Sequence, residues 1–164
     1  MNGSADLGKA KSLAYYYLGR KAYTQKELGE KLLKRFPPAL VKEVLAYLSD
    51  LGYLDDRKYT LNFLENKKRA RRGPRKIILD LQRRGVEPEN LARVKENYSC
   101  EEEETIAREL AQIKADAGKS PEQIYRFLLG RGFSLSTAGK LAGEFFKRRT
   151  NDAGTSDHRD GDSL

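Results

Sequence analysis

The chain has 164 residues, of which 38% are hydrophobic and 34% are charged, so we expect one or two ordinary domains with a small core. Its one cysteine, Cys100, and one histidine, His158, exclude an internal disulfide and zinc sites built from Cys and His. A nucleophilic triad would have to use His158, which lies in a polar C-terminal segment that we predict to be disordered.

Other classes of protein are disfavoured by missing motifs. No run of about 18 apolar residues predicts a membrane span, and the N-terminus lacks the apolar core of a secretory signal, so we expect a cytoplasmic protein. Neither GxxxxGK[ST] nor GxGxxG is present, so no phosphate-binding loop of a known type is predicted. We therefore expect no enzyme activity, no small-molecule substrate, no cofactor and no metal.

The positive charge is concentrated in one segment. Residues 57–84 hold 11 Lys and Arg residues against 2 Asp and Glu residues, a net charge of +9, whereas the whole chain has a net charge of +8. A solvated helix face usually mixes charges of both signs. The concentration therefore favours a polyanionic partner.

Hydrophobic periodicity is helical nearly throughout, and the chain repeats. The segments 24–36, 73–85 and 120–132 align at offsets of 49 and 47 residues. The aligned positions are Leu28 with Ile77 and Ile124, Leu32 with Leu81 and Leu128, and Arg35 with Arg84 and Arg131. Each segment opens with a helix start signal, and two of the signals are capping boxes, at Thr24 and at Ser120. Ser99 and Glu102 predict a further capping box at the start of another helix. Such self-similarity indicates a tandem array.

The repeat predicts an all-α fold of three tandem three-helix repeats. We place the first over residues 5–54, the second, basic one over 55–98, the third over 99–148, and a disordered acidic tail over 149–164. A unit of about 47 residues buries little core alone, so we expect the repeats to share contacts and form an elongated, curved rod.

Two short aromatic motifs occur at the edges of the first repeat. In "GYLDD" (52–56) we expect Gly52 to end a helix, Tyr53 and Leu54 to fill the joint, and one of the two aspartates to cap the next helix. The three tyrosines of "YYY" (15–17) cannot share one helix face, so some belong to the core and others are exposed.

The corner at Gly73-Pro74 lies within the basic segment. Arg75 and Lys76 fall in the first turn of the helix that Pro74 opens, where cations oppose the helix dipole by about 0.3–1 kcal/mol each. We expect free backbone N–H groups and clustered cations there to bind phosphate or carboxylate. The predicted binding residues are Lys67, Lys68, Arg69, Arg71, Arg72, Arg75, Lys76, Arg83 and Arg84.

The order of these elements resembles the RecX family of bacterial regulatory proteins. The resemblance rests on "YLGRKAYTQKELGEKL", "VLAYLSDLGYLDDRKYTLNFL" and "RRGPRKIILDLQRRGV", and covers about residues 10–146. It implies three three-helix modules that lodge in the groove of the RecA filament and modulate, usually inhibit, its ATPase, co-protease and strand-exchange activities, and so act in recombination, DNA repair and the SOS response. The predicted basic rod fits a groove lined by nucleoprotein, and the resemblance implies that the chain could also bind single- or double-stranded DNA directly, as some family members do. The acidic tail after Arg149 departs from the family pattern.

An alternative interpretation is a sequence-specific helix-turn-helix transcription regulator. Its recognition helix would need base-reading side chains opposite an apolar face. The predicted helix 74–84 offers Gln82 and Arg83 for this purpose, but it is short.

Overall fold

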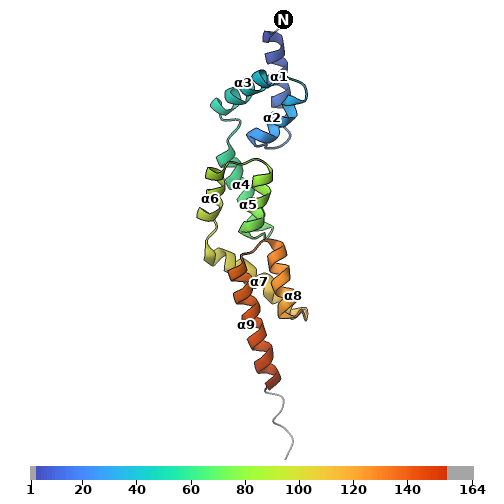
Figure 1. Cartoon of the computed structure of the whole chain (residues 1–164), viewed down its shortest axis with the longest axis vertical. Helices are drawn as coiled ribbons and strands as arrows, with labels where there is room; N and C mark the ends of the chain where they lie inside the picture. The colour runs from blue at the N-terminus through green and yellow to red at the C-terminus, as the bar shows by residue number, and fades with distance from the viewer. Residues whose placement is uncertain (1–2, 155–164) are drawn as a thin grey trace, which may run out of the picture. The chain divides into compact units, whose positions relative to one another are not determined.

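The computed structural model describes residues 3–154, and every regular element in that range is an α-helix (Figure 1). The predicted all-α class is therefore confirmed. In chain order the helices are α1 (Gly3–Leu18), α2 (Gln25–Leu33), α3 (Pro38–Asp50), α4 (Asp56–Arg69), α5 (Pro74–Arg83), α6 (Pro88–Glu96), α7 (Cys100–Asp116), α8 (Pro121–Arg131) and α9 (Leu135–Gly154). None of the helices in residues 3–154 combines the length and apolar character that a bilayer span requires.

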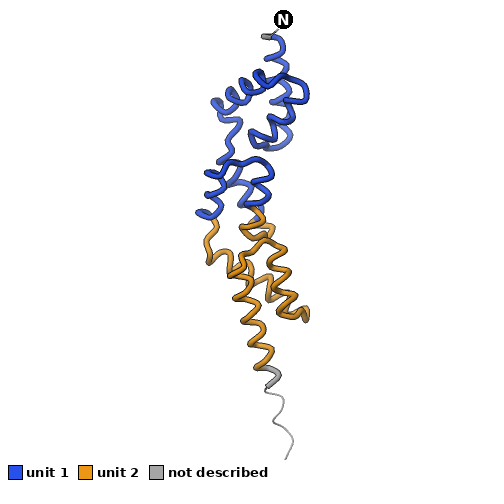
Figure 2. Tube along the Cα trace, in the orientation of Figure 1, with its two compact units in different colours: residues 1–67, 78–97 blue, residues 68–77, 98–164 orange. Residues whose placement is uncertain are grey.

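The helices fall into two compact units (Figure 2). Unit 1 comprises residues 1–67 and 78–97, and unit 2 comprises residues 68–77 and 98–164. The end of α4, the turn that follows it and the first turn of α5 thus belong with α7, α8 and α9. The most basic turn of the chain folds with the helices of the third predicted repeat.

Unit 1 contains an apolar cluster and a polar joint around the start of α2. The buried residues of the cluster are Ala10, Ala14, Tyr23, Leu28, Leu32, Val41, Val44, Leu48 and Leu54. At the joint the predicted capping box is present, because Thr24 Oγ1 accepts from the N–H of Glu27 at 3.1 Å. The same hydroxyl donates to the carbonyl oxygen of Arg84 at 2.6 Å, so the start of α2 is tied to the end of α5.

Unit 2 contains a second apolar cluster from α7, α8 and α9. Its buried residues are Ala107, Ala111, Ile124, Leu128, Phe133, Ala138, Leu141 and Phe145. Capping boxes open α7 at Ser99 and α8 at Ser120, as the sequence predicts. Glu103 of α7 is buried and accepts a hydrogen bond from the N–H of Ser134, immediately before α9. This contact satisfies a backbone donor where α9 begins.

Two expectations need correction. Leu54 fills the joint after α3, with 3% of its surface exposed, but Tyr53 is 57% exposed and does not fill it. Asp55 caps the next helix, accepting from the N–H of Lys58 at 2.9 Å. Helix α9 continues to Gly154, beyond residue 149, because residues 147–153 contain no glycine or proline that would end it. The remaining predicted tail, 155–164, and His158 with it, lies outside the described residues.

Candidate polyanion-binding site

The chain reverses direction between α4 and α5 in a short left-handed turn. Arg71 has φ of 54°, the one positive φ at a non-glycine residue in the described part of the chain. Its N–H donates to the carbonyl oxygen of Lys68 at 2.7 Å, which closes the end of α4. A left-handed conformation costs about 1–2 kcal/mol for a residue with a Cβ. Surrounding contacts must therefore stabilise the turn.

The stabilising contacts come from Arg131, at the end of α8. Its guanidinium donates to the carbonyl oxygen of Arg71 from Nε at 3.2 Å and from Nη2 at 2.9 Å, and also to the carbonyl oxygen of Ala70. The carbonyls of Ala70 and Arg71 follow the end of α4 and have no partner within the helix, and a side chain from α8 supplies one. The sequence alignment placed Arg131 at a repeated position, but nothing in the pattern indicated this partner.

Two glycines bring the backbones of the turn and of α8 together. A Cβ on Gly73 would lie 2.2 Å from the carbonyl carbon of Gly132 and 2.2 Å from the nitrogen of Phe133. Gly132 has φ of +92°, and it lies equally close to Lys76. A Cβ added to Gly132 would lie 2.3 Å from the Cβ of Lys76. Only glycine fits at either position.

This close approach corrects one premise of the predicted site. The N–H of Gly73 donates to the carbonyl oxygen of Arg131 at 2.9 Å, and the N–H of Arg75 donates to that of Gly132 at 3.0 Å. The backbone donors at the start of α5 that we expected to be free are thus satisfied by the end of α8. An anion at this corner must be bound by side chains.

The cations of the turn differ in how far they are already paired. Lys68 lies 3.1 Å from Glu102, Arg71 lies 3.4 Å from Glu109, and Lys76 donates to the carbonyl oxygen of Gly130 at 3.3 Å. By contrast, three arginines between Lys68 and Lys76 make no ion pair with any residue that the structure describes. These unpaired arginines are Arg69, Arg72 and Arg75.

Electrostatics at the turn indicate an excess of positive charge. The pKa of Arg131 lies below its ordinary value, because partial burial and the nearby charges of Arg72 and Arg71 disfavour its cationic form. The hydrogen bonds to carbonyl oxygens do not neutralise it. A bound anion would relieve this repulsion, which makes the turn, from Lys68 to Lys76, a candidate site for phosphate or carboxylate groups.

The other predicted binding residues, Lys67, Arg83 and Arg84, belong to unit 1. Arg84 pairs with Glu27 at 2.8 Å and donates to the hydroxyl of Tyr59 at 3.1 Å, so it holds the start of α2 in place. Lys67 lies over the ring of Phe63, with Nζ 5.0 Å from the ring centroid. Arg83 is exposed, and no ion pair links it to another described residue. Of these three residues, Arg84 has a structural role in addition to its charge, because of its contacts with Glu27 and Tyr59.

The helix-turn-helix alternative gains no support from α5. A recognition helix reads bases mainly with its N-terminal residues. The N-terminal turn of α5 is covered by the end of α8, because Lys76 abuts Gly132. Gln82 and Arg83 are exposed, but they lie at the opposite, C-terminal end of the helix.

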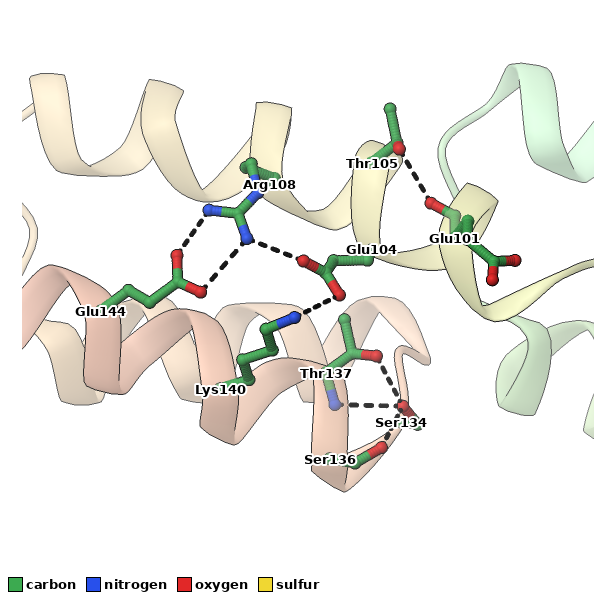
Figure 3. A network of polar contacts seen from close by, with 9 residues as sticks. All are labelled: Glu101, Glu104, Thr105, Arg108, Ser134, Ser136, Thr137, Lys140 and Glu144. Carbon is green, nitrogen blue, oxygen red and sulfur yellow. Dashed lines mark hydrogen bonds and ion pairs between the residues drawn. The ribbon is translucent and has the colours of Figure 1, made fainter.

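The acidic run at the start of α7 has structural partners. Glu102 closes the capping box with Ser99, and Glu104 accepts from Lys140 at 2.7 Å and from Arg108 at 2.8 Å. Arg108 also reaches Glu144, so α7 and α9 are linked by alternating charges (Figure 3). Among the residues described, no three His, Cys, Asp or Glu side chains gather closely enough to hold a metal ion.

These features define a class of protein: an all-α chain of repeated three-helix modules, whose most basic turn is fixed by a contact from the end of α8. Comparison with known proteins is specific. The model of the first three-helix domain of RecX matches residues 10–48. Regulatory protein RecX of Thermus thermophilus is 38% identical over 131 residues, which are 79% of this chain and 87% of that protein.

Other relatives agree. Regulatory protein RecX of Caldanaerobacter subterraneus subsp. tengcongensis is 30% identical over 134 residues, covering 80% of this chain and 68% of that protein. The crystal structure of RecX from Lactobacillus salivarius has the same fold, with a TM-score of 0.78 over 87% of this chain and 97% of that chain at 22% identity. The chain belongs to the RecX family of regulatory proteins, as its sequence motifs indicate.

Proposed function

We propose that this chain binds RecA–DNA filaments and lowers the ATPase, recombinase and co-protease activities of RecA. Its membership of a family of regulatory proteins supports a regulatory role. The observation that carries the proposal is the cluster of unpaired arginines, Arg69, Arg72 and Arg75, on a turn that α8 holds in place.

The chemistry of the turn fits a nucleoprotein surface. A filament on DNA offers phosphates and carboxylates, and arginine binds both through paired N–H donors. A preorganised turn loses little conformational entropy on binding, so its hydrogen bonds contribute more to affinity. The chain acts by occupying the filament and needs no catalytic group of its own.

The test is the DNA-dependent ATPase rate of RecA on single-stranded DNA, measured across a titration of this protein. We expect the rate to fall as the protein is added, while the protein alone hydrolyses no ATP. A second series with excess DNA separates filament binding from simple masking of DNA, since masking would disappear as DNA is added. An unchanged RecA rate across the titration would overturn the proposal.

A further inference from the structure

A pocket of about 290 Å³ lies within unit 2, where the end of α7, the start of α8 and the last turns of α9 meet. Its apolar lining includes Pro121 and Ile124 of α8 and Phe145 of α9. Ile124 and Phe145 also belong to the apolar cluster of unit 2, so the pocket lies against the edge of that core. Pockets that bind drug-sized molecules measure about 300–1,000 Å³, so this one is suited to a few side chains of a peptide segment.

Three cations surround the pocket. They are Lys119, in the turn between α7 and α8, and Arg148 and Arg149, near the end of α9. None of them makes an ion pair with a side chain that the structure describes. The lining includes one carboxylate, that of Asp116, which accepts a hydrogen bond from Gln112 at 2.7 Å. Three cations and one carboxylate leave the lining with a net charge of +2.

The guanidinium of Arg148 is oriented by the pocket wall. Its central carbon lies 5.3 Å from the centroid of the Phe145 ring, and its Nη1 donates to the side-chain oxygen of Gln112 at 3.4 Å. The ring keeps the cation beside apolar surface, where water screens its charge less than it does in bulk solution. A carboxylate on a short segment could therefore contact this cation while the rest of the segment covers the apolar wall.

We infer that this pocket binds the acidic segment 155–164 of the same chain, with its aspartates beside the three cations. The segment belongs to the tail that departs from the RecX pattern, and the proposed function gives it no role. Its charges complement those of the pocket, because it contains three aspartates, Asp157, Asp160 and Asp162, against one cation, Arg159. Both partners belong to one chain, so the contact requires no RecA.

Covalent connection favours this segment over an acidic peptide from another protein. Arg148 lies six residues before Gly154, where α9 ends, which is about 9 Å along the helix axis. A segment joined so close to its binding site has an effective concentration of the order of millimolar. A separate peptide would have to displace it.

The basic turn is a less suitable target for the same segment. The turn contacts Gly132, just before α9 begins, and the 20 residues of α9 span about 30 Å from there to Gly154. Ten residues reach at most about 33–36 Å when fully extended. The segment could therefore touch the turn only when nearly straight, whereas the pocket lies beside the last turns of α9. Binding in the pocket would cover the cations of α9 and leave those of the turn accessible.

The test places a nitroxide on the full-length chain at Ser163→Cys. Cys100→Ser accompanies it, because the one native cysteine is exposed and would also react. The nitroxide broadens the NMR signals of nearby amides, and its chemical reduction restores them. We expect the amide signals of Gly118 and Lys119 to lose most of their intensity while the label is oxidised, and those of residues 70–73 to keep it.

Variants of the labelled chain separate binding from mere attachment nearby. Arg148→Gln/Arg149→Gln removes two cations of the pocket and should restore most of the intensity at Gly118 and Lys119. The matched control is Arg126→Gln/Lys147→Gln, which removes the same charge at exposed residues of α8 and α9 outside the pocket lining. This control should leave the loss of intensity as it is in the parent.

A third variant neutralises the segment and keeps its length. Asp157→Asn/Asp160→Asn/Asp162→Asn should restore the signals of the pocket amides as Arg148→Gln/Arg149→Gln does. If the pocket binds the segment through these charges, both changes must act on the same amides.

Four outcomes would overturn the inference. Equal loss of intensity in the parent and in Arg148→Gln/Arg149→Gln would mean that attachment alone brings the label near α9. A loss that persists in the triple Asn variant would exclude recognition of the aspartates. No loss at residues 118 and 119 in the parent would exclude the contact. A loss at residues 70–73 in place of 118 and 119 would assign the segment to the basic turn.

Discussion

Arg131 donates two hydrogen bonds to the main-chain oxygen of Arg71, at 3.2 Å from Nε and 2.9 Å from Nη2. Arg131 thus holds Arg71 in its left-handed conformation, which sets the direction in which the Arg71 side chain leaves the turn. The arrangement brings like charges together and places a non-glycine residue at a positive φ. Both features oppose stability locally, and such violations of local preference are typical of functional sites.

We predict that Arg131→Met lowers both stability and filament binding. The loss of the cap on the end of α4 should cost about 1 kcal/mol, because hydrogen bonds from a partly exposed charged group are worth little more. The turn should then become mobile and bind RecA–DNA filaments more weakly. Thermal unfolding followed by circular dichroism measures stability, and titration of each variant against RecA–DNA filaments measures binding. Hydrogen exchange of the amides at 70–73 reports how well the turn is ordered.

The matched control is Arg126→Met, on the same helix and with the same change of charge. Arg126 is exposed and makes no ion pair within the described residues. It should leave both the unfolding temperature and the protection of the turn unchanged. Equal effects of the two variants on filament binding would show that net charge alone matters, and would contradict a positioning role for Arg131.

A second prediction concerns the contact between Gly73 and Gly132. Gly73→Ala places a methyl group 2.2 Å from backbone atoms of residues 132 and 133, which cannot move without shifting α8. We expect a loss of about 2 kcal/mol or more in the free energy of unfolding, measured by chemical denaturation.

Gly139→Ala is its control. Gly139 is an exposed residue of α9, and a Cβ there meets nothing within 4 Å. Alanine is favoured over glycine in a helix by about 0.8–1 kcal/mol, so this variant should be slightly more stable than the parent. If Gly73→Ala were tolerated equally well, the close backbone approach would not be what orders the turn.

The sequence predicted the parts of the fold that local chemistry determines. The capping boxes at Thr24, Ser99 and Ser120 are present, because each depends on residues three positions apart. Contacts distant in sequence were not predicted. The N–H groups of Gly73 and Arg75, which we expected to be free, donate to the carbonyl oxygens of Arg131 and Gly132.

For the same reason, the sequence could not show which of the basic residues are unpaired and available for binding. Nine basic residues appeared equivalent in the pattern, yet Arg84 is paired with Glu27, 57 positions away, while Arg72 is unpaired among the described residues. Partners at such separations depend on tertiary packing. Charge density located the region of the candidate site, and the structure was needed to separate structural cations from available ones.

A third prediction concerns acid stability. The pKa of Glu144 lies below its ordinary value of 4.5, because Arg108 hydrogen-bonds to it, and that of Glu104 is lowered by Lys140 and Arg108 (Figure 3). A carboxyl whose pKa falls on folding contributes stability that is present above its ordinary pKa and lost as pH drops through the lower folded-state value. We therefore expect the unfolding temperature to fall as the pH is lowered below 4.5.

Glu144→Gln should reduce this acid sensitivity, because the glutamine cannot titrate. The measurement is the difference in unfolding temperature between about pH 6 and about pH 3 for parent and variant. Glu43→Gln, at an exposed glutamate of α3 in unit 1, controls for the change of charge. An identical acid response in Glu144→Gln and the parent would contradict a contribution of the α7–α9 network.

The last prediction distinguishes a local site from general attraction. Arg72→Glu/Arg75→Glu reverses two unpaired cations of the turn, and Lys147→Glu/Arg148→Glu reverses two exposed cations of α9. Both changes take the net charge from +8 to about +4. A long-range effect of net charge predicts equal losses of affinity for RecA–DNA filaments, whereas a local site predicts a much larger loss for the first pair.

Folding should not explain the difference. Arg75 lies in the first turn of α5, where an acidic residue interacts favourably with the helix dipole by about 0.3–1 kcal/mol, so Arg75→Glu should not destabilise the chain. If Arg72 and Arg75 contact phosphates, the parent should also show a steeper fall of log affinity with log salt than the first variant. Equal affinities and equal salt slopes for the two variants would mean that the basic turn is only a solvated surface.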